Sequence, residues 1–183
     1  MTKKEVGNYI KEVRKIYLGG DYTEMTFRTA FETLIESLNP NYDLTHEPKR
    51  VTALGAPDFK AFLGSANIGY IETKNLGENL DNVLESVQLK KYIESIDNII
   101  LTDYARFMLI RKGEKVIDFN LFSLMDLKKS TFSISDENNE VFIQLMDEFF
   151  NYKLPTINGA EELAKELAKK AKTSRLTDEE AKE

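Results

Sequence analysis

Residues 55–74 read GAPDFKAFLGSANIGYIETK. Two stretches in this segment, 56–62 and 68–74, have the aromatic and aliphatic residues typical of strands, and the Gly64-Ser65 step between them is typical of a turn. We therefore predict an antiparallel hairpin centred on Ser65. Its register places Asp58 opposite Glu72, where directly paired side chains have Cβ atoms roughly 4.5–5.5 Å apart.

The predicted hairpin brings charged groups together at one end. Lys74 follows Glu72 by two residues and so lies on the same face of its strand, unless the register slips by one residue. Two carboxylates this close need a cation, a shared proton or a salt bridge, and Mg²⁺ prefers carboxylate oxygens, water and substrate phosphates. A lysine beside such a metal can orient the water that attacks a phosphodiester. The alternative is that Glu72 and Lys74 form an exposed ion pair and that Asp58 is a turn residue.

The helix predicted after this hairpin supplies two further candidate site residues. Gln88 and Tyr92 are four residues apart and so share one helical face. A helix that directly follows a strand can pack across the end of that strand and direct both side chains towards a bound phosphate. The alternative is a solvated glutamine and a half-buried tyrosine.

The rest of the chain predicts an α/β or α+β domain around one mixed sheet. Apolar residues at helical spacing predict helices over residues 4–18, 22–38, 80–96 and 137–152. Further strands are expected over residues 98–102, 106–111 and 115–122. Residues 1–153 would form this domain, and residues 154–183, rich in Ala, Glu and Lys, would form a helical connector.

The amino-acid composition excludes several kinds of catalytic and metal-binding site. The 183 residues contain no cysteine and one histidine, His46, so disulfides, thiolate zinc sites and multi-histidine metal sites are excluded. A net charge of −6 argues against binding nucleic acid by bulk charge alone, although a local basic groove stays possible. No apolar segment is long enough for a membrane span and no signal peptide is evident, so we expect a cytoplasmic protein.

The sequence resembles PD-(D/E)XK nucleases that carry a RecB-like or Mrr-like QxxxY helix. Three motifs carry this resemblance, in order: Pro57-Asp58, Glu72-Thr73-Lys74 and Gln88-Leu89-Lys90-Lys91-Tyr92. A wider set looks like the N-terminal nuclease domain of single-chain type IIG and type ISP restriction–modification enzymes, over roughly residues 20–125. It comprises Thr23–Arg28, Glu47-Pro48-Lys49-Arg50, Gly55–Phe59, Ile68–Lys74 and Leu101-Thr102-Asp103-Tyr104.

The resemblance implies a restriction-endonuclease-like mixed sheet flanked by helices, and a Mg²⁺-dependent DNA endonuclease in which Mn²⁺ substitutes. Asp58, Glu72 and the carbonyl of Thr73 would bind the metal, and Lys74 would position and polarise the attacking water. Gln88 and Tyr92 would steady a metal-bound water or the scissile phosphate.

Further residues follow from the same resemblance. A glutamate from the preceding helix would join the site, with Glu24 as the candidate and Glu32 and Glu36 as rivals. Lys49 and Arg50 would contact the DNA backbone, or else belong to a charged edge strand.

The implied partners are double-stranded DNA and the other domains of a full-length enzyme: a methyltransferase, a target-recognition domain and, in some members, a helicase. A transient dimer on DNA would allow both strands to be cut. Two other functions remain open: a nuclease-like module that binds DNA or protein without turnover, and a RecB-like exonuclease.

Overall fold

A computed structural model of the chain describes residues 3–46 and 57–153, which form a mixed sheet flanked by helices. The sheet has six strands in the order β1-β2-β3-β4-β5-β6. All neighbours are antiparallel except β3 and β4, which are parallel. The strands are β1 (Tyr42–His46), β2 (Phe59–Leu63), β3 (Ala66–Thr73), β4 (Asn98–Thr102), β5 (Arg106–Arg111) and β6 (Glu114–Asn120).

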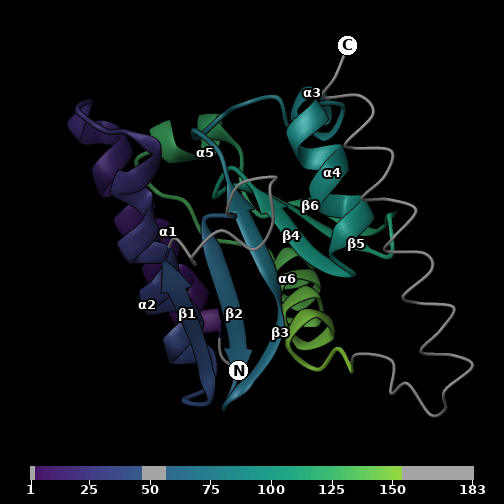
Figure 1. The fold of residues 1–183 in the computed structure, drawn as a ribbon. Coiled ribbons are helices and arrows are strands. Elements are labelled where there is room, and N and C mark those ends of the chain that lie inside the picture. Colours follow the sequence, from purple (N-terminus) through teal and green to yellow (C-terminus); the bar gives the residue numbers. More distant parts are fainter. Residues whose placement is uncertain (1–2, 47–56, 154–183) are drawn as a thin grey trace, which may run out of the picture. The chain divides into compact units, whose positions relative to one another are not determined.

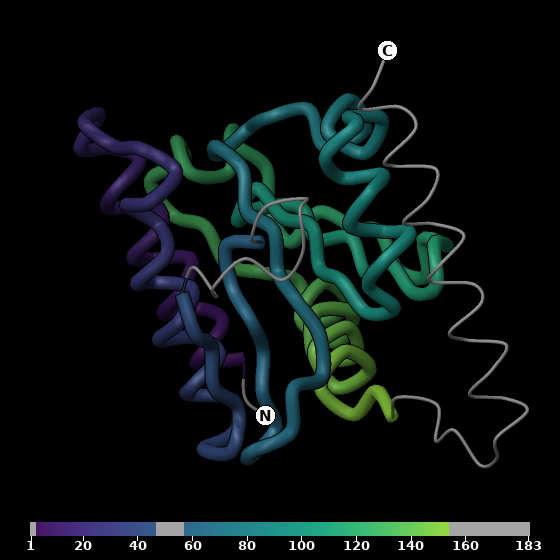
Figure 2. Tube along the Cα trace, viewed as in Figure 1, coloured from purple at the N-terminus to yellow at the C-terminus, as the bar shows by residue number. Residues whose placement is uncertain are grey.

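Helices cover both faces of this sheet (Figures 1 and 2). The first face is covered by α1 (Lys3–Gly19), the short 3₁₀ helix η1 (Glu24–Phe27), α2 (Arg28–Leu38), α5 (Leu124–Lys128) and α6 (Asp136–Phe150). The second face is covered by α3 (Leu80–Leu84) and α4 (Val87–Ser95), which lie in the crossover between β3 and β4. None of the helices in residues 3–46 and 57–153 is long and apolar enough to cross a membrane.

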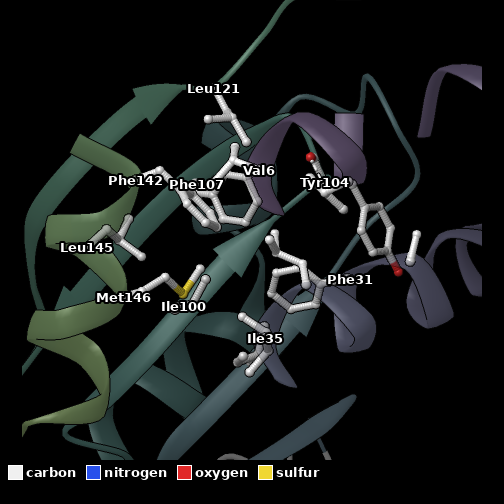
Figure 3. Close-up of a cluster of buried hydrophobic side chains, with 14 of the residues drawn as sticks. Val6, Phe31, Ile35, Ile100, Tyr104, Phe107, Leu121, Phe142, Leu145 and Met146 are labelled. Carbon is white, nitrogen blue, oxygen red and sulfur yellow. Dashed lines mark hydrogen bonds between the residues drawn. The ribbon is translucent and has the colours of Figure 1, made fainter. Parts of the chain in front are cut away.

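The larger core lies between the sheet and the first face, and it is rich in aromatic side chains. Phe107 of β5 packs edge-to-face against Phe142 of α6, with ring centroids 5.2 Å apart (Figure 3). On the α2 side, Phe31 contacts both Phe107 and Tyr104. Buried aromatic rings of this size contribute much of the apolar area that stabilises a fold.

The second core explains why the middle residues of β4 and β5 are apolar on both faces of the sheet. Ile99 and Leu101 of β4 pack with α3 and α4, whereas Ile100 between them packs into the larger core. Because successive side chains of a strand point to opposite faces, a strand that is covered on both sides must be apolar at every position. Strands β4 and β5 therefore lie in the middle layer, with helices packed on both of their faces.

The structure corrects the helix predicted over residues 80–96. It is broken into α3 and α4, because the Ser86 side chain accepts a hydrogen bond from the Leu89 N–H and so caps a new helix. Two further elements escaped prediction. Strand β1 is short and mostly polar at the sheet edge, and α5 has only five residues, begun by a capping box between Ser123 and Asp126.

Candidate active site

The β2–β3 hairpin has the predicted register next to the candidate site. Phe59 pairs with Ile71 and Ala61 pairs with Gly69, and the pairing shifts by one residue only beyond Ala61, towards the turn. Asp58 directly precedes β2, at the end of the hairpin where β3 finishes. In Figure 1 this is the end of β3 with the arrowhead, from which the chain continues to α3.

The side chains at this end of β3 divide between the two faces of the sheet. Glu72 pairs with Leu101 of β4, which packs with α3 and α4, so Glu72 lies on that face. Thr73 points to the opposite face, where its Oγ1 contacts η1. The site therefore spans the edge of the sheet and has a part on each face.

Asp58 is held on the Thr73 side through both carboxylate oxygens. Its Oδ2 accepts hydrogen bonds from the Thr73 main-chain N–H at 2.7 Å and from the Thr73 hydroxyl at 2.8 Å. Its Oδ1 accepts a short hydrogen bond from Nη2 of Arg28, the first residue of α2. The carboxylate is thus fixed by β3 and by α2 together.

Glu24 reaches the site from η1. Its Oε1 accepts a hydrogen bond from Arg28 Nη2 at 3.1 Å and lies 3.2 Å from Thr73 Oγ1. Its carbonyl oxygen accepts a hydrogen bond from the Tyr104 hydroxyl at 2.9 Å, which anchors η1 on the β4–β5 turn.

The two rival glutamates lie elsewhere on α2. Glu32 forms an ion pair with His46 of β1, and Glu36 is exposed to solvent. Of the three candidates, Glu24 is the one that the fold brings to Asp58 and Thr73.

Glu72 and Lys74 form the part of the site on the other face. Lys74 Nζ donates to Glu72 Oε1 at 2.7 Å, and the Glu72 side chain is only 7% exposed. Oε2 of Glu72 is buried and accepts no hydrogen bond from any described residue. A buried carboxylate oxygen without a donor is costly, and a cation would remove that cost.

The pKa values show that these charges act on one another. Burial raises the pKa of Glu72 and repulsion from Asp58 adds to this, while Lys74 opposes the shift. Burial lowers the pKa of Lys74, but Glu72, Asp58 and Glu24 outweigh it, so the pKa is raised. Lys74 therefore keeps its proton at neutral pH and acts as a hydrogen-bond donor.

Arg28 likewise stays charged. Burial lowers its pKa, but the attraction of Asp58 and Glu24 is stronger and raises it above the ordinary value. The guanidinium also lies over the Phe59 ring, 5.6 Å from its centroid, a contact that favours a cation.

Gln88 and Tyr92 are brought together on α4. Gln88 Nε2 donates to the Tyr92 hydroxyl at 3.1 Å, as their spacing of four residues predicts. Tyr92 is 2% exposed and belongs to the second core, whereas Gln88 is exposed. In the described part of the chain neither side chain hydrogen-bonds to Asp58, Glu72 or Lys74.

The donor atoms fit a small hard cation in part. Two carboxylates and the Thr73 carbonyl are oxygen donors of the kind that Mg²⁺ accepts, and the unpartnered Oε2 of Glu72 is a vacant acceptor. Among residues 3–46 and 57–153, however, no three His, Cys, Asp or Glu side chains are grouped closely enough to hold a metal ion. The remaining ligands would have to be water and substrate phosphate, which Mg²⁺ often retains.

Other predicted residues cannot be placed. Lys49 and Arg50, predicted to contact DNA, and Gly55-Ala56 lie outside the described residues, as does the predicted connector 154–183. Their roles stay predictions.

The sequence reasoning assigned no role to Arg28 or Tyr104, although both lie in segments that carried the family resemblance. A signal for Arg28 was present, since an arginine four residues after Glu24 predicts an ion pair. No local signal indicates that Arg28 also reaches Asp58, 30 residues away, or that Tyr104 reaches Glu24 across 80 residues.

Comparison with known proteins finds a solved structure with a similar fold. No protein-family model and no curated protein matches the sequence. A chain of the DrdV–DNA complex, solved by cryo-electron microscopy, matches with a TM-score of 0.62 and 21% sequence identity. The match covers 84% of the present chain and 14% of the DrdV chain, so the present chain spans about one seventh of that protein. These findings confirm the predicted fold class, an α/β mixed sheet of the restriction-endonuclease type flanked by helices.

Proposed function

We propose that this chain is a metal-dependent endonuclease module that hydrolyses phosphodiester bonds of double-stranded DNA. The observation that carries the proposal is that Asp58, Glu72 and Lys74 all lie at the end of β3, Asp58 against Thr73 and Glu72 against Lys74, with Glu72 buried and one of its oxygens lacking a donor among the described residues. Placing a buried carboxylate beside a half-buried carboxylate and a half-buried ammonium at one strand end is costly for a fold. A catalytic centre is one reason to bear that cost.

Each residue would have its own role in hydrolysis. Asp58, Glu72 and the Thr73 carbonyl would hold Mg²⁺, or Mn²⁺ in its place, and Glu24 would hold the hydrogen-bonding groups around them. Bound there, the ion would stabilise the negative charge that builds up on the phosphodiester. Lys74, which is protonated, would donate a hydrogen bond to the attacking water and orient it towards phosphorus. Gln88 is exposed at the same face of the sheet as Glu72 and could contact the phosphate, with Tyr92 holding its amide.

The DrdV structure supports DNA as the substrate, because its matching chain is solved in complex with DNA. It also supports the view that such a domain works inside a larger protein, since it amounts to 14% of that chain. We propose that the partners here are methyltransferase and target-recognition domains of a restriction–modification enzyme, with a helicase in some arrangements. Sequence specificity would then lie outside residues 1–153.

Nicking of supercoiled plasmid with Mg²⁺ or Mn²⁺ tests the proposal. We expect wild type to convert supercoiled DNA to open circles, and Asp58→Asn to lower the rate by at least about a hundredfold. Asparagine keeps the size of the side chain and its acceptor for Thr73, so the loss would reflect charge. Lys74→Met should lower the rate as well, since it removes the donor to water and keeps most of the apolar stem.

Asp43→Asn is the matched control. Asp43 is an exposed aspartate of β1, and we expect its variant to nick at the wild-type rate. Circular dichroism should show the same helix content in all four proteins. Equal nicking by wild type and Asp58→Asn would contradict the assignment of the site.

Binding without turnover is the second candidate, and one feature favours it. Asp58 already pairs with Arg28, and Glu72 already pairs with Lys74, so the charges are partly balanced with no metal. DNA binding that survives EDTA, with no product from any substrate, would support this function. An exonuclease would degrade linear DNA and leave closed circles intact, so the plasmid assay separates that case too.

A further inference from the structure

We propose that Arg28 is a resident counter-ion that a divalent cation must displace from Asp58, so that Arg28 sets the metal affinity of the site. This inference rests on the proposed metal-dependent function and adds a residue that the family motifs leave without a role. Arg28 would be a positioning and regulating residue, since it acts on metal binding through Asp58.

The contacts place Arg28 where a metal would compete with it. Its Nη2 contacts both Asp58 Oδ1 and Glu24 Oε1, so one cationic group joins two carboxylates. The Arg28 side chain is 9% exposed, and that of Asp58 is 18% exposed. A cation that binds Asp58 in so enclosed a position would meet the guanidinium directly.

Asp58 is also held by β3, through contacts that do not involve Arg28. The Thr73 main-chain N–H and hydroxyl both bind Oδ2, at 2.7 and 2.8 Å, and leave Oδ1 to the arginine. Loss of the guanidinium would therefore free an oxygen of a carboxylate that β3 still holds in place.

The charge balance of the site also supports this inference. Among the described residues, three carboxylates (Glu24, Asp58 and Glu72) face two cations, Arg28 and Lys74, so these five groups have a net charge of −1. Without Arg28 the net charge becomes −2, and the attraction for a divalent cation increases. Repulsion between Arg28 and the incoming ion disappears at the same time.

Calorimetric titration with Mn²⁺ in the absence of DNA tests this inference. We expect Arg28→Met to bind Mn²⁺ about tenfold more tightly than wild type. Arg28→Lys keeps the positive charge and should stay within about threefold of wild type. Arg14→Met is the matched control, because Arg14 of α1 donates to main-chain carbonyls of Leu127 and Lys129. Its affinity should equal that of wild type.

An unchanged or weaker affinity of Arg28→Met would overturn the inference. If that variant does not fold, side-chain NMR of wild type decides instead: the Arg28 Nε–Hε signal, identified by its loss in Arg28→Lys, should shift on titration with Mg²⁺. A signal that stays in place while Mg²⁺ binds would overturn the inference.

The same titrations separate this inference from the proposed function. Asp58→Asn should abolish binding. Binding by wild type that Asp58→Asn abolishes, with no change in Arg28→Met, would leave the metal site intact and reject only the role of Arg28. Absence of binding in every variant would reject both.

Discussion

Tyr104 has an unusual combination of backbone and side-chain constraints. Its φ of 72° lies in the left-handed region, which residues other than glycine seldom adopt. The side chain is fully buried, and its hydroxyl donates to the carbonyl oxygen of Glu24. Burial raises the pKa of Tyr104 to about 12, so the hydroxyl keeps its proton at neutral pH. One strained residue thereby fixes η1 beside the end of β3.

Replacing Tyr104 by phenylalanine should show the value of that hydroxyl. The ring stays packed, but the Glu24 carbonyl loses its donor, so we expect a loss of about 1–2 kcal/mol in the free energy of unfolding. Urea denaturation of wild type and the variant measures this change in the free energy of unfolding. Tyr70→Phe is the control, because among the described residues the Tyr70 hydroxyl makes a single hydrogen bond, a long contact of 3.5 Å with Asn67. The stability of this variant should change little. Equal losses in the two variants would contradict the anchoring role of Tyr104.

Strand β3 approaches β4 and α6 closely at Gly69. A Cβ built there would lie 2.5 Å from the carbonyl oxygen of Asn98 and 2.9 Å from a ring carbon of Phe149. Asn98 donates to the carbonyls of Ile68 and Phe149 and so joins β3, β4 and α6. The glycine is therefore required by the packing of three elements, although its φ is not in the left-handed region.

Gly69→Ala should destabilise the protein by about 1–3 kcal/mol, because the methyl group meets main-chain atoms that cannot move without disturbing the sheet. Gly7→Ala in α1 is the matched control, since nothing lies within 4 Å of its added Cβ. That substitution should stabilise the protein by about 0.5–1 kcal/mol, because glycine is a poor helix former. Urea denaturation of both variants is the measurement. A neutral Gly69→Ala would show that the strands have room to separate.

For the molecule as a whole, the presence of one candidate centre in residues 3–46 and 57–153 has consequences for DNA cleavage. Asp58, Glu72 and Lys74 occur once per chain, and one centre cuts one strand at a time. The chain also has a net charge of −6, so bulk charge does not hold it on DNA between two cuts. On the proposed function, a second copy would cut the second strand.

We therefore expect open circles to accumulate before linear DNA. The rate of linearisation should increase more steeply with protein concentration than the rate of nicking does. Adding excess Asp58→Asn protein to wild type should suppress linearisation while nicking continues, because an inactive copy occupies the second position. Gel electrophoresis of time courses provides both rates. Linearisation that is unaffected by the inactive protein would show that one copy cuts both strands.

The predictions that held depended on short-range patterns. The apolar stretches around Gly64-Ser65 predicted the hairpin and its register, which brings Asp58 to the end of β3 near Glu72 and Lys74. Helical spacing likewise predicted the contact between Gln88 and Tyr92. The break at Ser86 was missed, because apolar residues continue across it and a capping serine is a weaker signal than that periodicity.

By itself the sequence determined the order of the elements other than β1, α5 and the break between α3 and α4. It also excluded cysteine chemistry and multi-histidine metal sites, and it predicted the hairpin that carries the three charged residues. These features depend on residues that are neighbours along the chain or across one tight turn. Only the tertiary structure decided that Asp58 contacts Thr73 and Arg28, that Glu24 rather than Glu32 or Glu36 lies beside Thr73, and that Tyr104 anchors Glu24. These contacts join residues 15 to 80 positions apart. They exist because helices packed on the two faces of one sheet bring distant segments to the same edge, and no local pattern records that packing.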